Sequence, residues 1–181
     1  MIPILDLKAQ YRALASELDA AMRAVAASGH YILGPNVRAL EGEIASWCDC
    51  RFAVGVANGT DALHLALRAL RVGLGDEVIT TPFTFVATTE AIGMVGATPV
   101  FVDIDPVTLN LDPARVEAAI TPQTTAILPV HCYGRPCDTA ALQRIADTYG
   151  LKLIYDAAHA FGVRDGGGSV LRHGDLSVLS F

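Results

Sequence analysis

The sequence of 181 residues predicts an α/β fold in which helices sandwich a mostly parallel sheet. Short apolar runs recur along the chain, and segments with apolar residues three and four positions apart separate them. Strands that alternate with helices in this way are typical of a parallel sheet covered on both faces. The expected strands cover residues 52–57, 77–81, 98–103, 124–131, 151–156 and 175–181.

The composition indicates a folded chain, because 52% of the residues are hydrophobic and the charge is low. The net charge is −6 and basic residues are scattered singly, which gives no footprint for nucleic acid or an anionic membrane. No apolar run approaches the ~20 residues that span a bilayer, and the first residues do not resemble a signal peptide. We expect a cytoplasmic protein with neither kind of partner.

The cysteines are expected to be free thiols. Cys48, Cys50, Cys132 and Cys137 do not form a disulfide framework typical of a small exported protein. A zinc site that combined them with His131 is disfavoured, because neither pair has the spacing of a structural zinc turn.

Residues 7–27 and 37–47 carry apolar side chains at helical spacing, and these predicted helices imply no chemistry. The hydrophobic run 151–155 is more informative, because it ends in Asp156 and His159 follows three residues later. Ligands of open α/β sheets bind at the carboxyl ends of strands, so Asp156 is a candidate site residue. The alternative is that Asp156 only caps the next turn.

Two further junctions are candidate parts of a site. Gly59 and Thr60 follow an expected strand and open a helix, with Thr60 at the expected N-cap, so this turn could bind a phosphate or be an ordinary capped turn. Phe83 and Phe85 occupy alternate positions of an extended segment, so at most one should face the core. The other could face a cleft. The glycines of residues 163–170 predict a hairpin or a flexible loop.

Seven segments of the sequence stand out in their order and spacing: residues 31–35, 58–63, 75–79, 83–88, 96–105, 129–134 and 156–159. Together they resemble the DegT/DnrJ/EryC1/StrS family over nearly the whole chain. Members of that family are pyridoxal-phosphate enzymes with the aspartate-aminotransferase fold, and most of them transaminate keto-sugars carried on a nucleotide.

The resemblance implies that Asp156 pairs with the pyridine nitrogen of the cofactor, where it keeps the ring protonated and able to act as an electron sink. Phe85 matches the aromatic residue that stacks on the ring, which makes Phe83 the candidate for the core. His159 stands beside the phenolic oxygen of the ring, where many relatives carry Gln.

The resemblance also implies the phosphate ligands. Gly59 and Thr60 match the turn that offers backbone N–H groups and a hydroxyl, and Ser180 matches a second phosphate ligand.

The implied function is transfer of an amino group from an amino-acid donor, glutamate, to a nucleotide-linked keto-sugar by a homodimer. The family's Schiff-base lysine falls just beyond Phe181, and Lys8 and Lys152 do not match its position. Residues 1–181 are therefore expected to be an incomplete cofactor-binding large domain that is inactive alone. The alternatives are a sugar dehydratase of the same family, with histidine at the lysine position, and a non-catalytic fragment.

Overall fold

The computed structural model describes residues 4–181. They fall into two compact units, the first ending at Glu43 and the second beginning at Ile44. The boundary lies within the second of two helices, α1 (Leu7–Ser28) and α2 (Pro35–Trp47), and both helices were predicted. The assignment of residues 1–181 to one incomplete domain stays a prediction.

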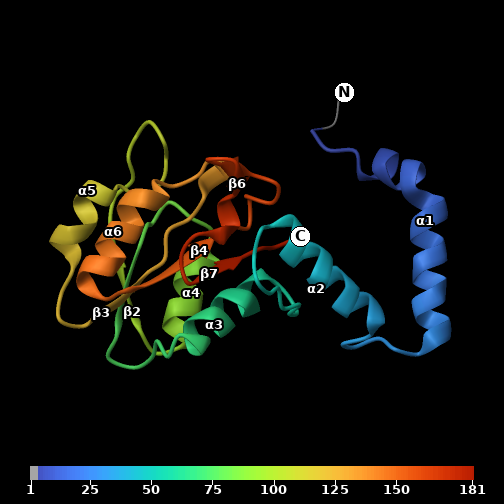
Figure 1. The fold of residues 1–181 in the computed structure, drawn as a ribbon, viewed down its shortest axis with the longest axis horizontal. Coiled ribbons are helices and arrows are strands. Elements are labelled where there is room, and N and C mark those ends of the chain that lie inside the picture. Colours follow the sequence, from blue (N-terminus) through green and yellow to red (C-terminus); the bar gives the residue numbers. More distant parts are fainter. Residues whose placement is uncertain (1–3) are drawn as a thin grey trace. The chain divides into compact units, whose positions relative to one another are not determined.

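The second unit contains a five-stranded sheet in the order β2-β1-β3-β4-β7 (Figure 1). Every neighbouring pair in this sheet is parallel, which confirms the predicted fold class. The strands are β1 (Glu77–Thr80), β2 (Thr98–Phe101), β3 (Thr124–Ile127), β4 (Lys152–Asp156) and β7 (Leu176–Val178).

Helices and short turns connect these strands, and a small antiparallel hairpin confirms the prediction for residues 163–170. The helices are α3 (Gly59–Ala69), α4 (Val86–Met94), α5 (Pro113–Val116) and α6 (Thr139–Tyr149), and the short 3-10 turns are η1 (Glu117–Ala119), η2 (Cys132–Gly134) and η3 (Val170–Arg172). The hairpin pairs β5 (Arg164–Asp165) with β6 (Gly168–Ser169).

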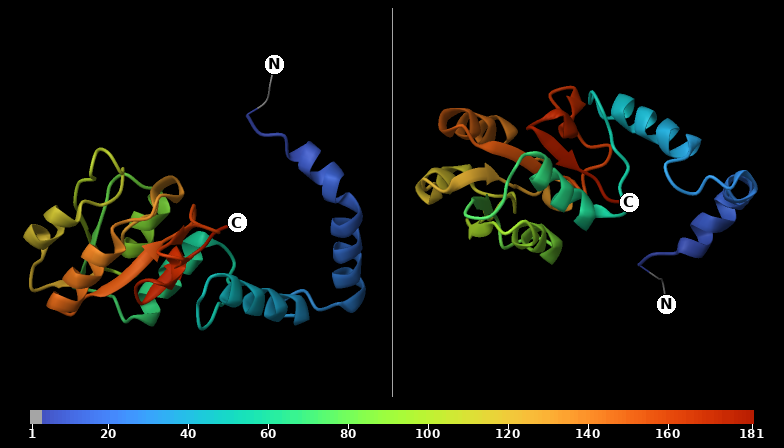
Figure 2. Two further views of the ribbon diagram at one scale, coloured as in Figure 1. Left: turned by 45° about the horizontal axis from the view of Figure 1, so that its top comes forward. Right: turned by 90° about the horizontal axis from the view of Figure 1, so that it is seen from below.

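Helices cover both faces of the sheet (Figure 2), and neighbouring residues of β4 pack against different helices. Ile154 packs in one apolar core with Leu67 of α3 and Ile92 of α4. Tyr155 points to the other face and packs with Leu142 of α6. Because successive side chains of a strand face opposite ways, a strand covered on both faces needs apolar residues in its middle, as residues 153–155 of β4 are.

The prediction of a strand at residues 52–57 is wrong. This segment belongs to none of the strands of the five-stranded sheet, and Phe52 and Val54 are exposed. A strand requires a neighbour in the ladder as well as an apolar sequence, and the apolar sequence alone misled the prediction.

The expected N-cap of α3 is also corrected. Asn58, not Thr60, caps the helix, because its Oδ1 accepts a hydrogen bond from the backbone N of Asp61 at 2.9 Å. Thr60 lies inside the first turn of the helix instead.

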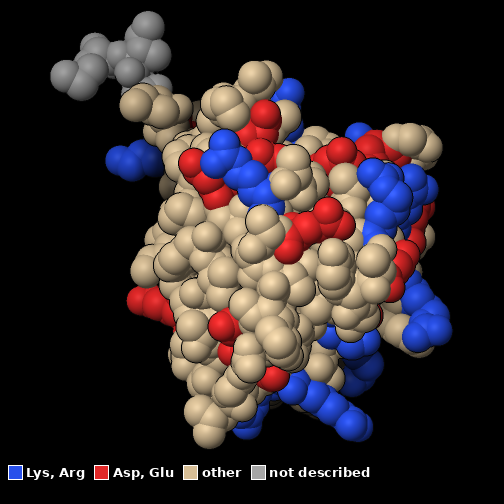
Figure 3. All heavy atoms as spheres, turned by 90° about the vertical axis from the view of Figure 1, so that its left-hand side faces the viewer, with Lys and Arg blue, Asp and Glu red and all other residues tan. Residues whose placement is uncertain are grey.

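The surface in Figure 3 carries acidic and basic side chains interspersed, without a large region of one sign. Within residues 4–181, no helix combines the length and apolarity that crossing a membrane would need.

Candidate functional site

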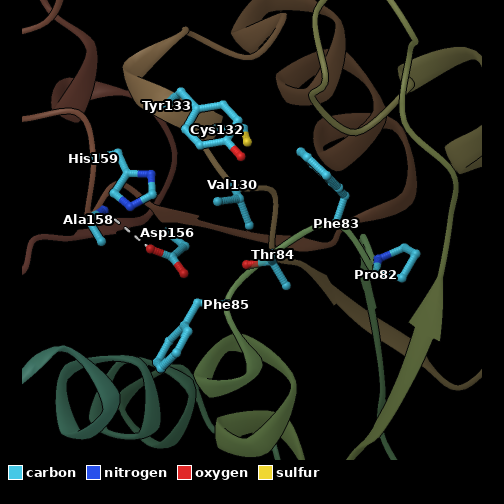
Figure 4. Close-up of a pocket in the computed structure, with 10 residues that line it drawn as sticks. All are labelled: Pro82, Phe83, Thr84, Phe85, Val130, Cys132, Tyr133, Asp156, Ala158 and His159. Atoms are coloured by element: carbon cyan, nitrogen blue, oxygen red, sulfur yellow. Dashed lines mark hydrogen bonds between the residues drawn. The ribbon is translucent and has the colours of Figure 1, made fainter. Parts of the chain in front are cut away.

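A pocket of about 280 Å³ lies where β1, β3 and β4 end and their connecting segments begin. Phe85, Asp156 and His159 line it, so three of the predicted site residues meet around one space (Figure 4). Phe83 and Tyr133 line it as well. The carboxyl ends of parallel strands meet at one edge of a sheet, which is why segments distant in sequence converge here.

Asp156 is the last residue of β4, and 6% of its surface is exposed. Its Oδ2 accepts a hydrogen bond from Thr88 Oγ1 at 2.8 Å, and its Oδ1 accepts one from the backbone N of Ala158 at 3.2 Å. The bond to Ala158 is the local turn contact that the capping alternative describes. The hydrogen bond from Thr88 joins α4 to the end of β4, which a residue that only caps the next turn would not do.

The hydroxyl of Thr88 is itself oriented. Thr84 Oγ1 lies 2.8 Å from Thr88 Oγ1, and Thr88 is fully buried. An ionised carboxylate can only accept hydrogen bonds, so Thr88 donates to Asp156 and must accept from Thr84. This chain of donors stabilises a negative charge on Asp156.

Backbone hydrogen bonds on both sides fix the end of β4. On one side, the N of Asp156 donates to the O of Pro129 at 2.9 Å, and the N of His131 donates to the O of Asp156 at 3.0 Å. On the other side, the N of Ala157 donates to the O of Val178 at 2.9 Å. The carboxylate therefore extends from a backbone held on both sides.

Phe85 precedes the first residue of α4, and 74% of its surface is exposed. Figure 4 shows its ring on the opposite side of the Asp156 carboxylate from Tyr133 and His159. The expectation that Phe83 belongs to the core is wrong, because 40% of Phe83 is exposed and it lines the pocket. The rings of Phe83 and Tyr133 meet edge to face, with centroids 6.3 Å apart. Phe83 therefore packs in the wall of the pocket and not in the core.

His159 stacks on Tyr133, with ring centroids 6.1 Å apart and planes inclined by 8°. Both side chains are exposed toward the pocket (Figure 4). The wall beside the carboxylate is thus formed by three rings: Phe83, Tyr133 and His159.

The predicted phosphate residues meet at the start of α3. A Cβ added to Gly59 would lie 2.9 Å from the Cβ of Ser180 and 3.0 Å from its Oγ, so a larger residue does not fit without movement. The first N–H groups of a helix have no partner within the helix, and those of Gly59 and Thr60 belong to this set. A hydroxyl beside a helix N-terminus is a donor set suited to a phosphate.

These residues do not line the pocket of Asp156, but they lie at the same edge of the sheet. Asp156 pairs in register with Val178, and Ser180 follows two residues later. A carboxylate acceptor, an exposed aromatic ring and a cradle of N–H and hydroxyl donors fit the parts of pyridoxal phosphate. The individual roles of the six residues stay predictions.

Lys152 cannot supply an amine to this pocket. It is the first residue of β4, and four residues of strand place it ~13 Å from Asp156 along the sheet. Its Nζ lies 3.5 Å from Asp175 Oδ1 at that opposite end.

The sequence interpretation did not assign roles to Thr84, Thr88, Ala158 or Tyr133. Thr84 and Thr88 lie within residues 83–88, which already carried the family resemblance. Thr84 precedes the extended residue Phe85, which caps α4, so the contact between the two hydroxyls is not one that helical spacing predicts. Nothing local in the sequence connects Thr88 with Asp156, which is 68 residues away.

Comparison with known proteins identifies similar enzymes. The chain is 50% identical over 162 residues to the UDP-2-acetamido-2-deoxy-3-oxo-D-glucuronate aminotransferase of Pseudomonas aeruginosa, covering 90% of this chain and 45% of that protein. It is 47% identical over 180 residues to the dTDP-3-amino-3,4,6-trideoxy-alpha-D-glucose transaminase of Streptomyces venezuelae, covering 99% and 48%. The chain therefore spans about half the length of these curated relatives.

A solved structure agrees with these relatives. NtdA from Bacillus subtilis, determined with bound cofactor PMP, superposes with a TM-score of 0.92 at 34% identity, covering 99% of this chain and 41% of that one. The family model described as the DegT/DnrJ/EryC1/StrS aminotransferase family matches residues 12–181. The chain belongs to the DegT/DnrJ/EryC1/StrS aminotransferase family.

Proposed function

We propose that this chain is the cofactor-binding part of a pyridoxal-phosphate-dependent aminotransferase that transfers an amino group from glutamate to a nucleotide-linked keto-sugar. The observation that carries the proposal is the buried Asp156 carboxylate at the pocket, held by Thr88 and the backbone of Ala158. Membership of the aminotransferase family supports the same reaction class.

When bound, pyridoxal phosphate supplies an electron sink for transamination. Asp156 would accept a hydrogen bond from the protonated pyridine nitrogen, and this charge-assisted bond would favour the protonated form. Thr88 and Ala158 N hold the carboxylate in orientation, so it need not reorganise during the reaction. His159 offers a polar contact near the phenolic oxygen of the ring.

Phe85 would cover one face of the ring of a bound cofactor. Its exposed position leaves the side chain available for a planar partner, and offset stacking of aromatic rings is favourable beyond the burial of area. Gly59, Thr60 and Ser180 bind the phosphate through N–H and hydroxyl donors, so an acidic protein needs no basic patch for it.

The substrate proposal draws on the names of two relatives. One is named for a UDP-linked 3-oxo sugar and the other for a dTDP-linked amino sugar, so both sugars are carried on a nucleoside diphosphate. We assign the same class of acceptor to the whole protein, with glutamate as donor, a homodimeric assembly and a cytoplasmic location.

Binding of pyridoxamine phosphate to the 181-residue chain tests the proposal, because this form of the cofactor needs no lysine. Asp156→Asn keeps the shape of the side chain but removes the charge, and should weaken binding by about 1.5–3 kcal/mol in isothermal titration calorimetry. In the whole enzyme, the same change should lower transamination severely.

Asp147→Asn is the matched control, since Asp147 is exposed on α6 and accepts a hydrogen bond from Gln143 of the same helix. It should leave the affinity unchanged. Equal affinities for the wild type and Asp156→Asn would refute the assigned role of Asp156.

A further inference from the structure

Asn110 is a buried polar residue that does not itself line the pocket, and 2% of its surface is exposed. Its Nδ2 donates to the O of Arg135 at 3.0 Å and to the O of Pro136 at 2.9 Å. Its Oδ1 accepts from the N of Cys132 at 3.0 Å. One side-chain amide thus connects the start and the end of the turn 132–136.

The turn that Asn110 closes has an unusual backbone. Tyr133 has a φ of 52° and Gly134 a φ of 77°, so two successive residues adopt the left-handed region. For tyrosine this region is sparsely populated, and such a conformation persists only where surrounding contacts impose it. The three hydrogen bonds of Asn110 are contacts of this kind.

The same turn forms part of the pocket wall. The ring of Tyr133 stacks on His159 at 6.1 Å, and a Cβ added to Gly134 would lie 2.8 Å from the O of His159. Both the side chain of Tyr133 and the backbone of Gly134 therefore depend on how the turn is closed. A shift of the turn moves the surface against which His159 rests.

We propose that Asn110 is a positioning residue, which fixes the turn 132–136 and thereby holds Tyr133 in its stacked contact with His159. The bonded distances and the burial of the amide carry this inference. Its consequence for cofactor binding rests on the proposed function, whereas the ring geometry can be measured without any cofactor.

A second bond joins the same two segments but is not equivalent. Arg135 Nη1 donates to the O of Val107 at 2.7 Å, and both residues are exposed. Water can replace an exposed donor, whereas the carbonyl groups that Asn110 satisfies would lose a buried partner. Arg135→Gln is therefore a matched control that removes a contact between the two segments and leaves the turn closed.

Nuclear magnetic resonance of the 181-residue chain tests the proposal directly. His159 is assigned from the signals that disappear in His159→Gln, and Tyr133 from those that disappear in Tyr133→Leu. In the wild type, nuclear Overhauser effects should connect the two rings. In Asn110→Ser these effects should be lost and the His159 ring signals should shift, while Arg135→Gln keeps both.

Two comparisons separate positioning from general loss of stability. Ile145→Val removes one methyl group from the buried face of α6, and should lower stability without altering the His159 signals. Because Asn110 is proposed to act mainly through the ring of Tyr133, Asn110→Ser should shift the His159 ring signals much less in Tyr133→Leu than in the wild type. Unchanged ring contacts in folded Asn110→Ser would overturn the proposal.

A measurement on the wild type covers the case in which Asn110→Ser does not fold. The side-chain amide protons of Asn110 should exchange with solvent far more slowly than those of Asn36, which is exposed. Equally fast exchange would show that the hydrogen bonds of the Asn110 amide are not maintained in solution, and would also overturn the proposal. Loss of pyridoxamine phosphate binding by Asp156→Asn tests the proposed function separately.

Discussion

The two ends of the candidate site are built differently. At the Asp156 end, a nearly buried carboxylate receives hydrogen bonds from Thr88 and Ala158. At the end proposed to bind the phosphate, Ser180 is exposed, and Gly59 beside it offers only backbone groups. A charge removed from water needs partners fixed in advance, whereas a helix N-terminus already presents unpaired N–H groups to a phosphate.

The Asp156 end also includes a buried imidazole. His131 is 0% exposed, and its Nδ1 accepts a hydrogen bond from the N of Cys137 at 3.0 Å, so its proton resides on Nε2. Its ring stacks on Tyr155 with centroids 4.6 Å apart. Burial lowers the pKa of His131 to about 4. This end should therefore be the more sensitive to acid.

The largest expected effect is on stability below neutral pH. The pKa of His131 is lower in the folded chain than in the unfolded chain, so its contribution is complete above pH 6.5 and is lost as the pH falls toward about 4. The difference between a pKa of 6.5 in the unfolded chain and about 4 in the folded chain corresponds to about 3 kcal/mol in the free energy of unfolding. Denaturant unfolding between pH 7 and pH 4 should show this loss.

Carboxylates also titrate in this pH range, so a variant without the imidazole is needed to separate the contribution of His131 to the pH dependence of stability. His131→Gln should have a flatter dependence of the free energy of unfolding on pH. His30→Gln is the control, because His30 is exposed. Parallel pH curves for the wild type and His131→Gln would contradict the prediction.

A smaller effect should follow when the carboxylate loses one donor. Thr88→Val preserves shape and removes the hydroxyl, which leaves Asp156 Oδ2 and the hydroxyl of Thr84 without that partner. A loss of about 2 kcal/mol is expected in the free energy of unfolding, since the unpaired groups stay buried. Urea denaturation of both proteins would measure it.

Thr125→Val is the matched control, because the buried Oγ1 of Thr125 has no hydrogen-bond partner within the described residues. Its replacement should be neutral or stabilising. An equal loss in the free energy of unfolding for Thr88→Val and Thr125→Val would mean that the hydrogen bond from Thr88 to Asp156 does not stabilise the fold.

At the end proposed to bind the phosphate, Gly59→Ala should have a steric effect, because it adds a methyl group and changes no charge. The new Cβ would crowd the Cβ and Oγ of Ser180, so we expect a cost of about 1 kcal/mol in the free energy of unfolding. The affinity for pyridoxamine phosphate should fall, and the affinity for pyridoxamine, which lacks the phosphate, should not. Titration calorimetry with both compounds would separate the two ends.

Gly93→Ala gives the control within a helix, since an added Cβ there meets nothing within 4 Å. It should slightly stabilise the chain, because glycine is unfavourable inside helices. A fall in pyridoxamine affinity equal to that for its phosphate in Gly59→Ala would remove the distinction between the ends.

Sequence reasoning predicted what depends on local pattern. The apolar run before Asp156 predicted a buried strand and a carboxylate at its end, and the structure has both. It failed at residues 52–57, because pairing depends on a neighbour that sequence does not specify. It also missed the hydrogen bond from Thr88 to Asp156 and the hydrogen bonds of Asn110 to the turn 132–136. The partners in these bonds are distant in sequence and meet only in the folded chain.

The alternation of Phe83 and Phe85 shows a subtler failure. The period of two correctly separates the two side chains, but it assumes that one side is the core. Here both sides are open, because the segment crosses the end of the sheet, where the pocket takes the place of a packed layer. Periodicity identifies opposite directions and does not identify what lies in each direction.

The smallest expected effect compares these two aromatic residues. Phe85→Leu keeps an apolar side chain and removes the aromatic face, so the affinity for pyridoxamine phosphate should fall by about 0.5–1.5 kcal/mol. The free energy of unfolding should barely change, because 74% of Phe85 is exposed. Phe83→Leu should instead disturb the edge contact with Tyr133 and change the affinity less. If Phe83→Leu weakened binding more than Phe85→Leu, the cofactor ring would have to lie against the Tyr133 wall.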